Sequence, residues 1–186
     1  MKALALMWFC SCLSAATLRY WIDPGPAHAT GCRAGDAELA RWALEAWQSA
    51  SDGKLKLQPA AERERAHIRV YWAAGRDGLY GEALPIVVDG VRGAEVYVQP
   101  AVVPPEEKDG LLRDAIVYLT CLHETGHALG LPHTAAFDDI MYSFQYGGDI
   151  PEYFARYRRQ LSSRADIRTH AGMSAADRKR LSELYR

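Results

Sequence analysis

Residues 123–133 read His-Glu-Thr-Gly-His-Ala-Leu-Gly-Leu-Pro-His. His123 and His127 are four residues apart, so on a helix their imidazoles lie one turn apart on the same face. That spacing allows two ring nitrogens to reach one metal ion at about 2.0–2.1 Å. Glu124 is rotated by about a quarter turn from His123, which makes it a poor third ligand but lets it reach a water molecule at the ion. The segment therefore predicts a helix with a metal-binding face.

The end of this segment predicts a third ligand. Gly130 can take the left-handed conformation that ends a helix, and Pro132 cannot continue one. The chain then turns and can bring a further histidine back under the metal. Three protein ligands with a fourth position left open are the arrangement of catalytic rather than structural zinc. We expect one catalytic Zn²⁺ ion with the ligands His123, His127 and His133.

The length of the pattern separates it from chance. The short His-Glu-x-x-His pattern also occurs in proteins whose histidines are simply buried or solvated. The longer pattern specifies five residues, and its chance occurrence in a chain of this size is on the order of one in a hundred thousand. A carboxylate beside an open metal position has no purpose in a structural site. Glu124 is therefore expected to be the general base of a hydrolytic reaction.

Composition limits the class of protein. The chain has 186 residues, a formal net charge of -1 and 49% hydrophobic residues, which is the ordinary range for one globular domain. The near-neutral charge argues against a nucleic-acid-binding protein, which needs a clustered basic face. Arginines are frequent after residue 156, but acidic residues interleave with them, as on a solvated helix surface.

The first sixteen residues have the pattern of a secretory signal. Lys2 is the only charge before Arg19, residues 3–13 are apolar apart from one serine, and residues 14–16 are small. The apolar run is too short to span a bilayer, and no later run is long enough. We expect a signal peptide over residues 1–16, a mature domain over 17–186, and a secreted protein, extracellular or periplasmic. A buried first helix, or lipid attachment at a cysteine of the leader, are the alternatives.

Removal of this leader leaves two of the four cysteines, Cys32 and Cys121. Cys121 lies about 200° round the expected helix from His123, which turns it away from the metal and towards the body of the domain. An oxidising compartment permits a bridge between the two, and such a bridge would close a long loop. We therefore predict a Cys32–Cys121 disulfide, although the sequence does not place the two residues within bridging distance.

The remaining sequence mixes strand and helix signals. β-branched and aromatic residues predict strands over residues 17–22, 66–72, 79–88 and 94–99. Helical spacing predicts helices over residues 36–49, capped by Asp36, and 110–129, and Ser174 has the pattern of a cap opening a last helix. The class predicted is α+β.

The long histidine pattern resembles that of the metzincin clan of zinc peptidases, in which a methionine turn follows. Met141, in Ile140-Met141-Tyr142, stands eight residues after His133 and is similar to that turn. Within the clan the likeness is to the matrixins, particularly small secreted bacterial ones. The resemblance implies a twisted, mostly parallel sheet of about five strands, a long zinc-binding helix, a C-terminal helical subdomain, and Met141 as an apolar floor beneath the metal.

The same resemblance implies a protein or peptide substrate that lies extended along the edge strand, most plausibly residues 80–84. Tyr142, Phe144 and Tyr146 are candidates for the wall of a specificity pocket, and packing in the core is the alternative for each. Two departures from relatives stand out. Ser143 occupies the position at which astacins and serralysins carry a tyrosine ligand, and no propeptide with a zinc-blocking cysteine is evident. A zinc-binding protein without turnover and a zinc hydrolase of non-peptide bonds remain alternatives.

Overall fold

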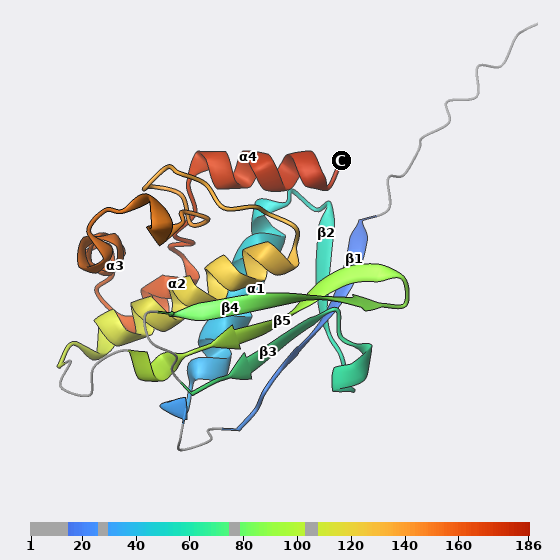
Figure 1. Ribbon diagram of the computed structural model, residues 1–186, viewed down its shortest axis with the longest axis horizontal. Helices are drawn as coiled ribbons and strands as arrows, with labels where there is room; N and C mark the ends of the chain where they lie inside the picture. Colours follow the sequence, from blue (N-terminus) through green and yellow to red (C-terminus); the bar gives the residue numbers. More distant parts are fainter. Residues whose placement is uncertain (1–14, 26–29, 75–78, 103–107) are drawn as a thin grey trace, which may run out of the picture.

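The computed structural model describes residues 15–25, 30–74, 79–102 and 108–186 (Figure 1). Residues 1–14 of the expected signal peptide lie outside this part of the chain, and that prediction stays untested. Among the described residues, no helix combines the length and apolarity needed to cross a bilayer.

Across the described ranges, the strands form one five-stranded sheet at the centre of the domain. Its strands are β1 (Ala16–Ile22), β2 (Leu55–Pro59), β3 (Ile68–Trp72), β4 (Gly81–Val88) and β5 (Val91–Val98), in the order β2-β1-β3-β5-β4. The first four strands in that order are parallel, and β4 pairs antiparallel to β5 at the edge. The mostly parallel sheet and the mixed class are thus confirmed.

Two sheet features differ from expectation. The five-residue strand β2 was not predicted, and it pairs with β1 along its whole length. The β4–β5 hairpin is also tighter than predicted. Asp89 and Gly90 form a two-residue turn with φ of 51° and 77°, so β5 already begins at Val91. Such left-handed pairs match the twist of a hairpin and favour a glycine at the second position.

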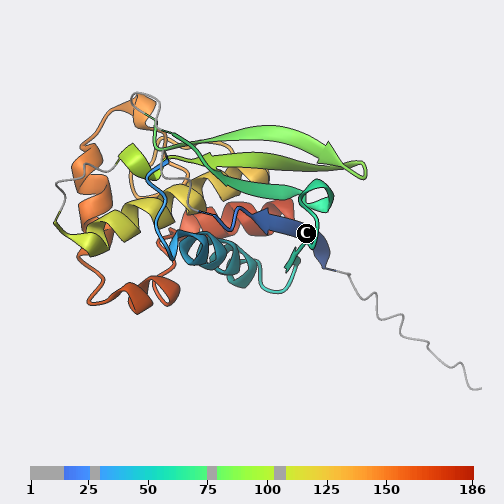
Figure 2. The same cartoon turned by 90° about the horizontal axis from the view of Figure 1, so that it is seen from below.

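In the described part of the chain, four α-helices accompany the sheet: α1 (Asp36–Ala50), α2 (Gly110–Ala128), α3 (Ile150–Arg158) and α4 (Ala175–Leu184). Figure 2 shows α1 and α2 on one side of the sheet. Inward residues of β3 are buried beneath these helices, and the Trp47 indole of α1 donates to the Leu122 carbonyl of α2 at 2.9 Å. The core therefore lies between the sheet and the helix that carries the histidine pattern.

The helix termini follow the capping rules with one correction. The Asp109 carboxylate accepts from the N–H groups of Leu111 and Leu112 at the start of α2, and Ser174 forms the expected capping box with Asp177. Asp36, predicted as a cap, is instead the first residue of α1, and Gly35 stands at the cap with φ of 98°. The Asp36 carboxylate is bound elsewhere.

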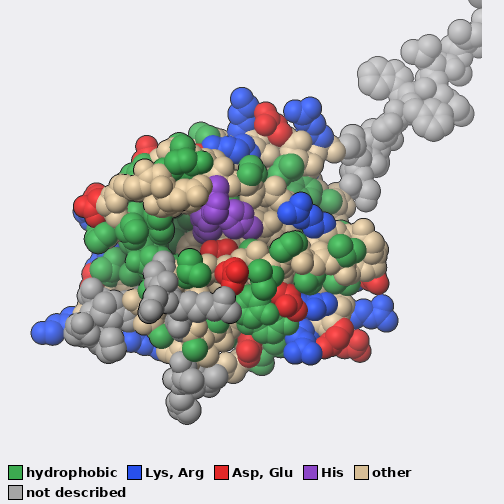
Figure 3. Space-filling view, in the orientation of Figure 1, with side chains coloured by type: hydrophobic (Ala, Val, Ile, Leu, Met, Phe, Trp, Pro, Cys, Tyr) green, Lys and Arg blue, Asp and Glu red, His purple; other side chains and the backbone are tan. Residues whose placement is uncertain are grey.

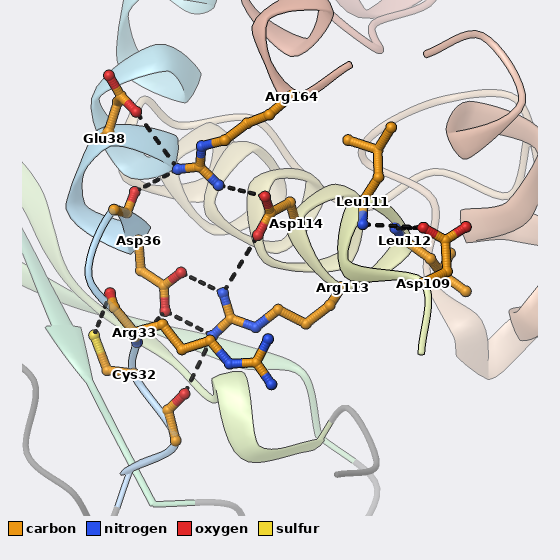
Figure 4. Close-up of polar contacts among 12 residues, drawn as sticks. Cys32, Arg33, Asp36, Glu38, Asp109, Leu111, Leu112, Arg113, Asp114 and Arg164 are labelled. Carbon is orange, nitrogen blue, oxygen red and sulfur yellow. Dashed lines mark hydrogen bonds and ion pairs between the residues drawn. The ribbon is translucent and has the colours of Figure 1, made fainter. Parts of the chain in front are cut away.

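A buried ion pair explains that difference (Figure 4). The Arg113 guanidinium of α2 donates through both of its terminal nitrogens to the Asp36 carboxylate, and both side chains are nearly inaccessible to solvent. The same guanidinium also donates to the Gly31 carbonyl at 3.1 Å. Arg164 extends the network to Asp114 and Glu38. Removing one partner of a buried pair costs about 3–5 kcal/mol, so this network ties α1 firmly to α2.

Within the described residues, Cys32 and Cys121 are both free thiols, contrary to the predicted disulfide. Cys121 is fully buried on the body side of α2, as its position on the helix predicted. Cys32, however, lies in a segment arranged around the Arg113 guanidinium, and its sulfur approaches the Arg33 carbonyl at 3.8 Å. Burial, with the neighbouring Asp36 carboxylate, raises the pKa of Cys32 to about 12.

Candidate metal centre

The expected ligands converge on one point. His123 and His127 lie on the last turns of α2, which ends at Ala128, and Gly130 follows with φ of 100°. The reversal at Gly130 brings His133 back, so that its Nε2 lies 3.1 Å from Nε2 of both His123 and His127. On the face drawn in Figure 3, histidine side chains gather beside a hollow in the surface.

Backbone carbonyls orient two of the rings. The Ile140 carbonyl lies 2.6 Å from His123 Nδ1, and the Leu131 carbonyl lies 2.9 Å from His127 Nδ1. A carbonyl can only accept, so each Nδ1 carries the ring proton and each Nε2 presents a lone pair to the common centre. Metal-binding histidines are held in this way in other proteins.

The donor set fits a zinc ion. Ligand atoms 2.0–2.1 Å from a tetrahedral zinc are about 3.3–3.4 Å apart, close to the observed 3.1 Å. Lone pairs that face each other at this distance repel unless a cation lies between them. Burial lowers the pKa of His123 to about 3 and also lowers the pKa of His127 and His133. All three imidazoles are therefore neutral near pH 7, as metal binding requires.

Glu124 lies at the same site, and its side chain is mostly buried. Burial, followed by the neighbouring Glu82 carboxylate, raises the pKa of Glu124 to about 8. A cation at the histidines would act in the opposite direction, because an opposite charge favours the carboxylate. Glu124 is thus a largely buried carboxyl group beside the three converging histidines.

Met141 packs against α2, the helix that carries His123 and His127. It is fully buried, and a Cβ built on Gly126 of α2 would stand 2.4 Å from its sulfur. Only a glycine at position 126 therefore lets the turn approach α2 so closely. Ile140, just before Met141, supplies the carbonyl that orients His123.

The last helix secures this turn, a role that the sequence did not reveal. Asp177, fully buried at the start of α4, accepts from the Ile140 N–H at 2.8 Å and from the Ser174 N–H at 2.9 Å. Asp139 accepts from Ser174 Oγ at 2.6 Å and from Thr134 Oγ1 at 2.9 Å. A capping box was visible in the sequence, but nothing there showed that its acid reaches the methionine turn.

A cavity of about 520 Å³ opens beside the histidines and Glu124. Residues of β4 line it from the sheet edge. Tyr142 and Phe144 line it as predicted, whereas Tyr146 is 57% exposed and lies outside its lining. The sequence missed three further rings of the lining, those of Tyr80, Tyr153 and Phe154.

Comparison with known proteins adds little to this geometry. No protein-family model matches the chain, and no curated protein matches it. Among solved structures, archaemetzincin from Methanopyrus kandleri is similar with a TM-score of 0.48 and 14% sequence identity, over 95% of this chain and 98% of that chain. Similarity at this level does not identify a function, which has to come from the site itself.

Proposed function

We propose that this chain is a secreted zinc metallopeptidase of the matrixin type that cleaves peptide bonds within extended substrates. One observation carries the proposal. His133 Nε2 lies 3.1 Å from Nε2 of both His123 and His127, and the ligand atoms of all three lie within 4.8 Å of one another at the edge of an open cavity, with Glu124 beside them. Three neutral ligands, an accessible fourth position and an adjacent carboxylate are the components of a hydrolytic zinc site.

In the proposed hydrolysis, Glu124 transfers the proton and two backbone carbonyls orient the metal ligands. When bound, zinc supplies Lewis acidity, which makes a water molecule more acidic and polarises a carbonyl group. The Glu124 carboxylate accepts a proton from the attacking water and then donates it to the departing amine. The carbonyls of Ile140 and Leu131 keep the rings of His123 and His127 in one tautomer. Glu124 thus acts as base and then as acid.

The edge strand β4 offers the main-chain groups that an extended peptide needs. The Tyr80 carbonyl accepts from the Gln99 N–H at 2.9 Å, so Tyr80 directs its main-chain groups towards β5. Successive residues of an antiparallel pair point alternately to the partner and away from it. Gly81 and Ala83 therefore direct their N–H and C=O groups to the free edge, beside the cavity they line. A substrate strand can pair with them there.

The same alternation places Pro85 at the free edge, where its missing N–H disturbs no bond within the sheet. Gly81 and Ala83 therefore each offer a substrate both an N–H donor and a C=O acceptor, whereas Pro85 offers no donor. This agrees with an expected pairing segment over residues 80–84.

Secretion rests on the leader sequence. Cleavage after Ala16 would leave Thr17 to Ile22 of β1 in the mature chain, and the rest of the sheet would be untouched. Amino-terminal sequencing of the protein recovered from the medium or periplasm tests this. Recovery only from the cytoplasm with an intact leader would contradict it.

The function is tested by incubating the zinc-loaded mature protein with a library of unstructured peptides and mapping the cuts by mass spectrometry. We expect defined cleavage sites that disappear when a chelator removes the metal. A protein that holds zinc but cuts no peptide would be a binding protein. Hydrolysis of esters or other amides without any peptide cleavage would indicate a zinc hydrolase of another class.

A further inference from the structure

We infer that Gly81 is a positioning residue for Glu124. The missing side chain at position 81 lets the backbone of β4 lie directly against the Glu124 side chain, and this contact sets where the carboxylate stands in the cavity. The inference rests on the proposed function, because it concerns the group that would move the proton.

The contact leaves no room for a methyl group. A Cβ built on Gly81 would lie 2.7 Å from Cγ and 3.0 Å from Oε1 of Glu124, and 2.9 Å from Cγ2 of Thr120. Real Cβ atoms do not approach other atoms so closely, so something would have to shift. Gly81 is not among the glycines with positive φ. A side chain there is therefore excluded by space and not by backbone conformation.

Contact is also the main restraint on this carboxylate. Among the residues that the structure describes, no hydrogen bond or ion pair joins the Glu124 carboxylate to another group. Thr120 lies one turn earlier on the same face of α2, and its hydroxyl is committed to the Ile116 carbonyl at 2.8 Å. The side chain of Glu124 is therefore enclosed by Thr120 on its own helix and by Gly81 across the cavity edge.

The strand that supplies this contact cannot easily withdraw. Gly81 pairs with Val98, which is almost fully buried, and the Tyr80 carbonyl beside it is bonded to the Gln99 N–H. An added methyl group at position 81 would thus displace the end of the Glu124 side chain rather than the strand. A shift of about 1 Å in a reacting group can cost on the order of 10²-fold in rate.

The first experiment compares two glycine substitutions in the zinc-loaded mature protein. Gly81→Ala is expected to lower kcat by about 10- to 100-fold, with zinc content and KM nearly unchanged. Gly110→Ala is the matched control, because a Cβ built there meets nothing within 4 Å. It should keep the parent kcat. An unchanged kcat in Gly81→Ala would overturn the inference.

A double-mutant cycle with Glu124→Ala shows whether Gly81 acts through Glu124. In that background, Gly81→Ala should cause no further loss of the residual hydrolysis, because no carboxylate remains to be displaced. A loss by the same factor in both backgrounds would mean that position 81 acts on the substrate or on the fold, and would overturn the inference.

Thermal midpoints of the same four zinc-loaded proteins give a readout that does not depend on activity. Gly81→Ala should lower the midpoint in the parent and lower it less in Glu124→Ala, where only the Thr120 contact remains. If Gly81→Ala lowered the midpoint equally in both backgrounds, or lowered it in neither, the contact between position 81 and Glu124 would be contradicted. If the parent protein cleaves no peptide, the proposed function fails, while these midpoints still decide whether Gly81 confines Glu124.

Discussion

The cavity has two sides of different origin. The metal wall consists of His123, Glu124, His127 and His133, which lie within eleven consecutive residues. The aromatic wall consists of Tyr80, Phe144, Tyr153 and Phe154, which come from three separate segments: the approach to β4, the turn after Met141, and α3. Local spacing in the sequence indicated the metal wall, whereas the rings of Tyr80, Tyr153 and Phe154 reach the cavity only through tertiary packing and were not predicted.

The rings of the aromatic wall hold one another in place. The centroids of Tyr80 and Phe154 are 4.9 Å apart, those of Phe144 and Tyr153 are 5.2 Å apart, and those of Tyr153 and Phe154 are 5.4 Å apart. Edge-to-face and tilted pairs at these distances are favourable beyond the burial of their area. We expect the metal wall to control turnover and the aromatic wall to control which side chain the cavity accepts.

The largest effect is expected from the metal wall itself. His133→Ala leaves two ligands, which bind zinc far more weakly than three, so the purified variant should lose stoichiometric zinc and all peptide cleavage. Metal analysis of dialysed protein measures the first and a peptide assay the second. His170→Ala is the control, because His170 is exposed and lies outside the converging set. Full zinc retention in His133→Ala would remove this histidine from the ligand set.

The next effect concerns turnover alone. Glu124→Gln keeps the size of the side chain but cannot accept the proton of water, so kcat should fall by roughly 10²–10⁴-fold. Zinc content and KM should change little, because the ligands are intact and Glu124 would act only as the transition state forms. A zinc-loaded variant that cleaves at the parent rate would refute the role of Glu124 as base.

A change in the aromatic wall should alter stability and the choice of peptide, whereas a change at Glu124 should alter turnover alone. Phe154 is almost fully buried, so Phe154→Ala should lower the free energy of unfolding by about 3–5 kcal/mol and enlarge the cavity. Zinc content should remain, while the peptides cleaved should shift towards larger apolar side chains at the residue that enters the cavity. Denaturant unfolding and a peptide library measure these two outcomes.

Tyr146→Ala is the matched control for this wall. Tyr146 is 57% exposed and does not line the cavity, so its loss should change stability by no more than about 0.5 kcal/mol and leave the cleavage pattern alone. If Phe154→Ala instead lost its zinc, the two walls would not be separable in function.

The sequence predicted the metal wall because a helix converts spacing into geometry directly. The four-residue interval in α2 and the stop at Gly130 follow from local rules, whereas the buried Met141 was expected only from the resemblance to a known family. The parts that were missed depend on partners distant in the chain. The short strand β2 exists because it pairs with β1, and Cys32 is held by the network of Arg113 rather than by Cys121.

The aromatic residues of α3 illustrate the same limit. Tyr153 and Phe154 stand in a stretch rich in tyrosine and arginine, and nothing in the sequence predicted that their rings line a cavity. In the structure, both rings are buried and face the cavity, and the Tyr153 hydroxyl also donates to the Asp139 carbonyl at 3.0 Å. No local period marks such residues, because their burial depends on where α3 docks.

The smallest predicted effect concerns His67, a histidine outside both walls. His67 lies just before β3 and is buried, and its Nδ1 accepts from the Arg19 N–H at 2.9 Å. Burial, followed by the charge of Arg19, lowers the pKa of His67 below its usual 6.5. The unfolded chain therefore binds this proton at a higher pH than the folded protein does, so stability should fall as the pH drops below about 6.5 and be flat above it. One proton limits this slope to about 1.4 kcal/mol per pH unit.

His67→Asn keeps an acceptor oxygen for Arg19 but does not titrate. Denaturant unfolding from pH 5 to 8 should therefore show a smaller loss of unfolding free energy at acid pH than in the parent. Parallel profiles for the two proteins would mean that His67 takes up its proton equally well in the folded and unfolded chains.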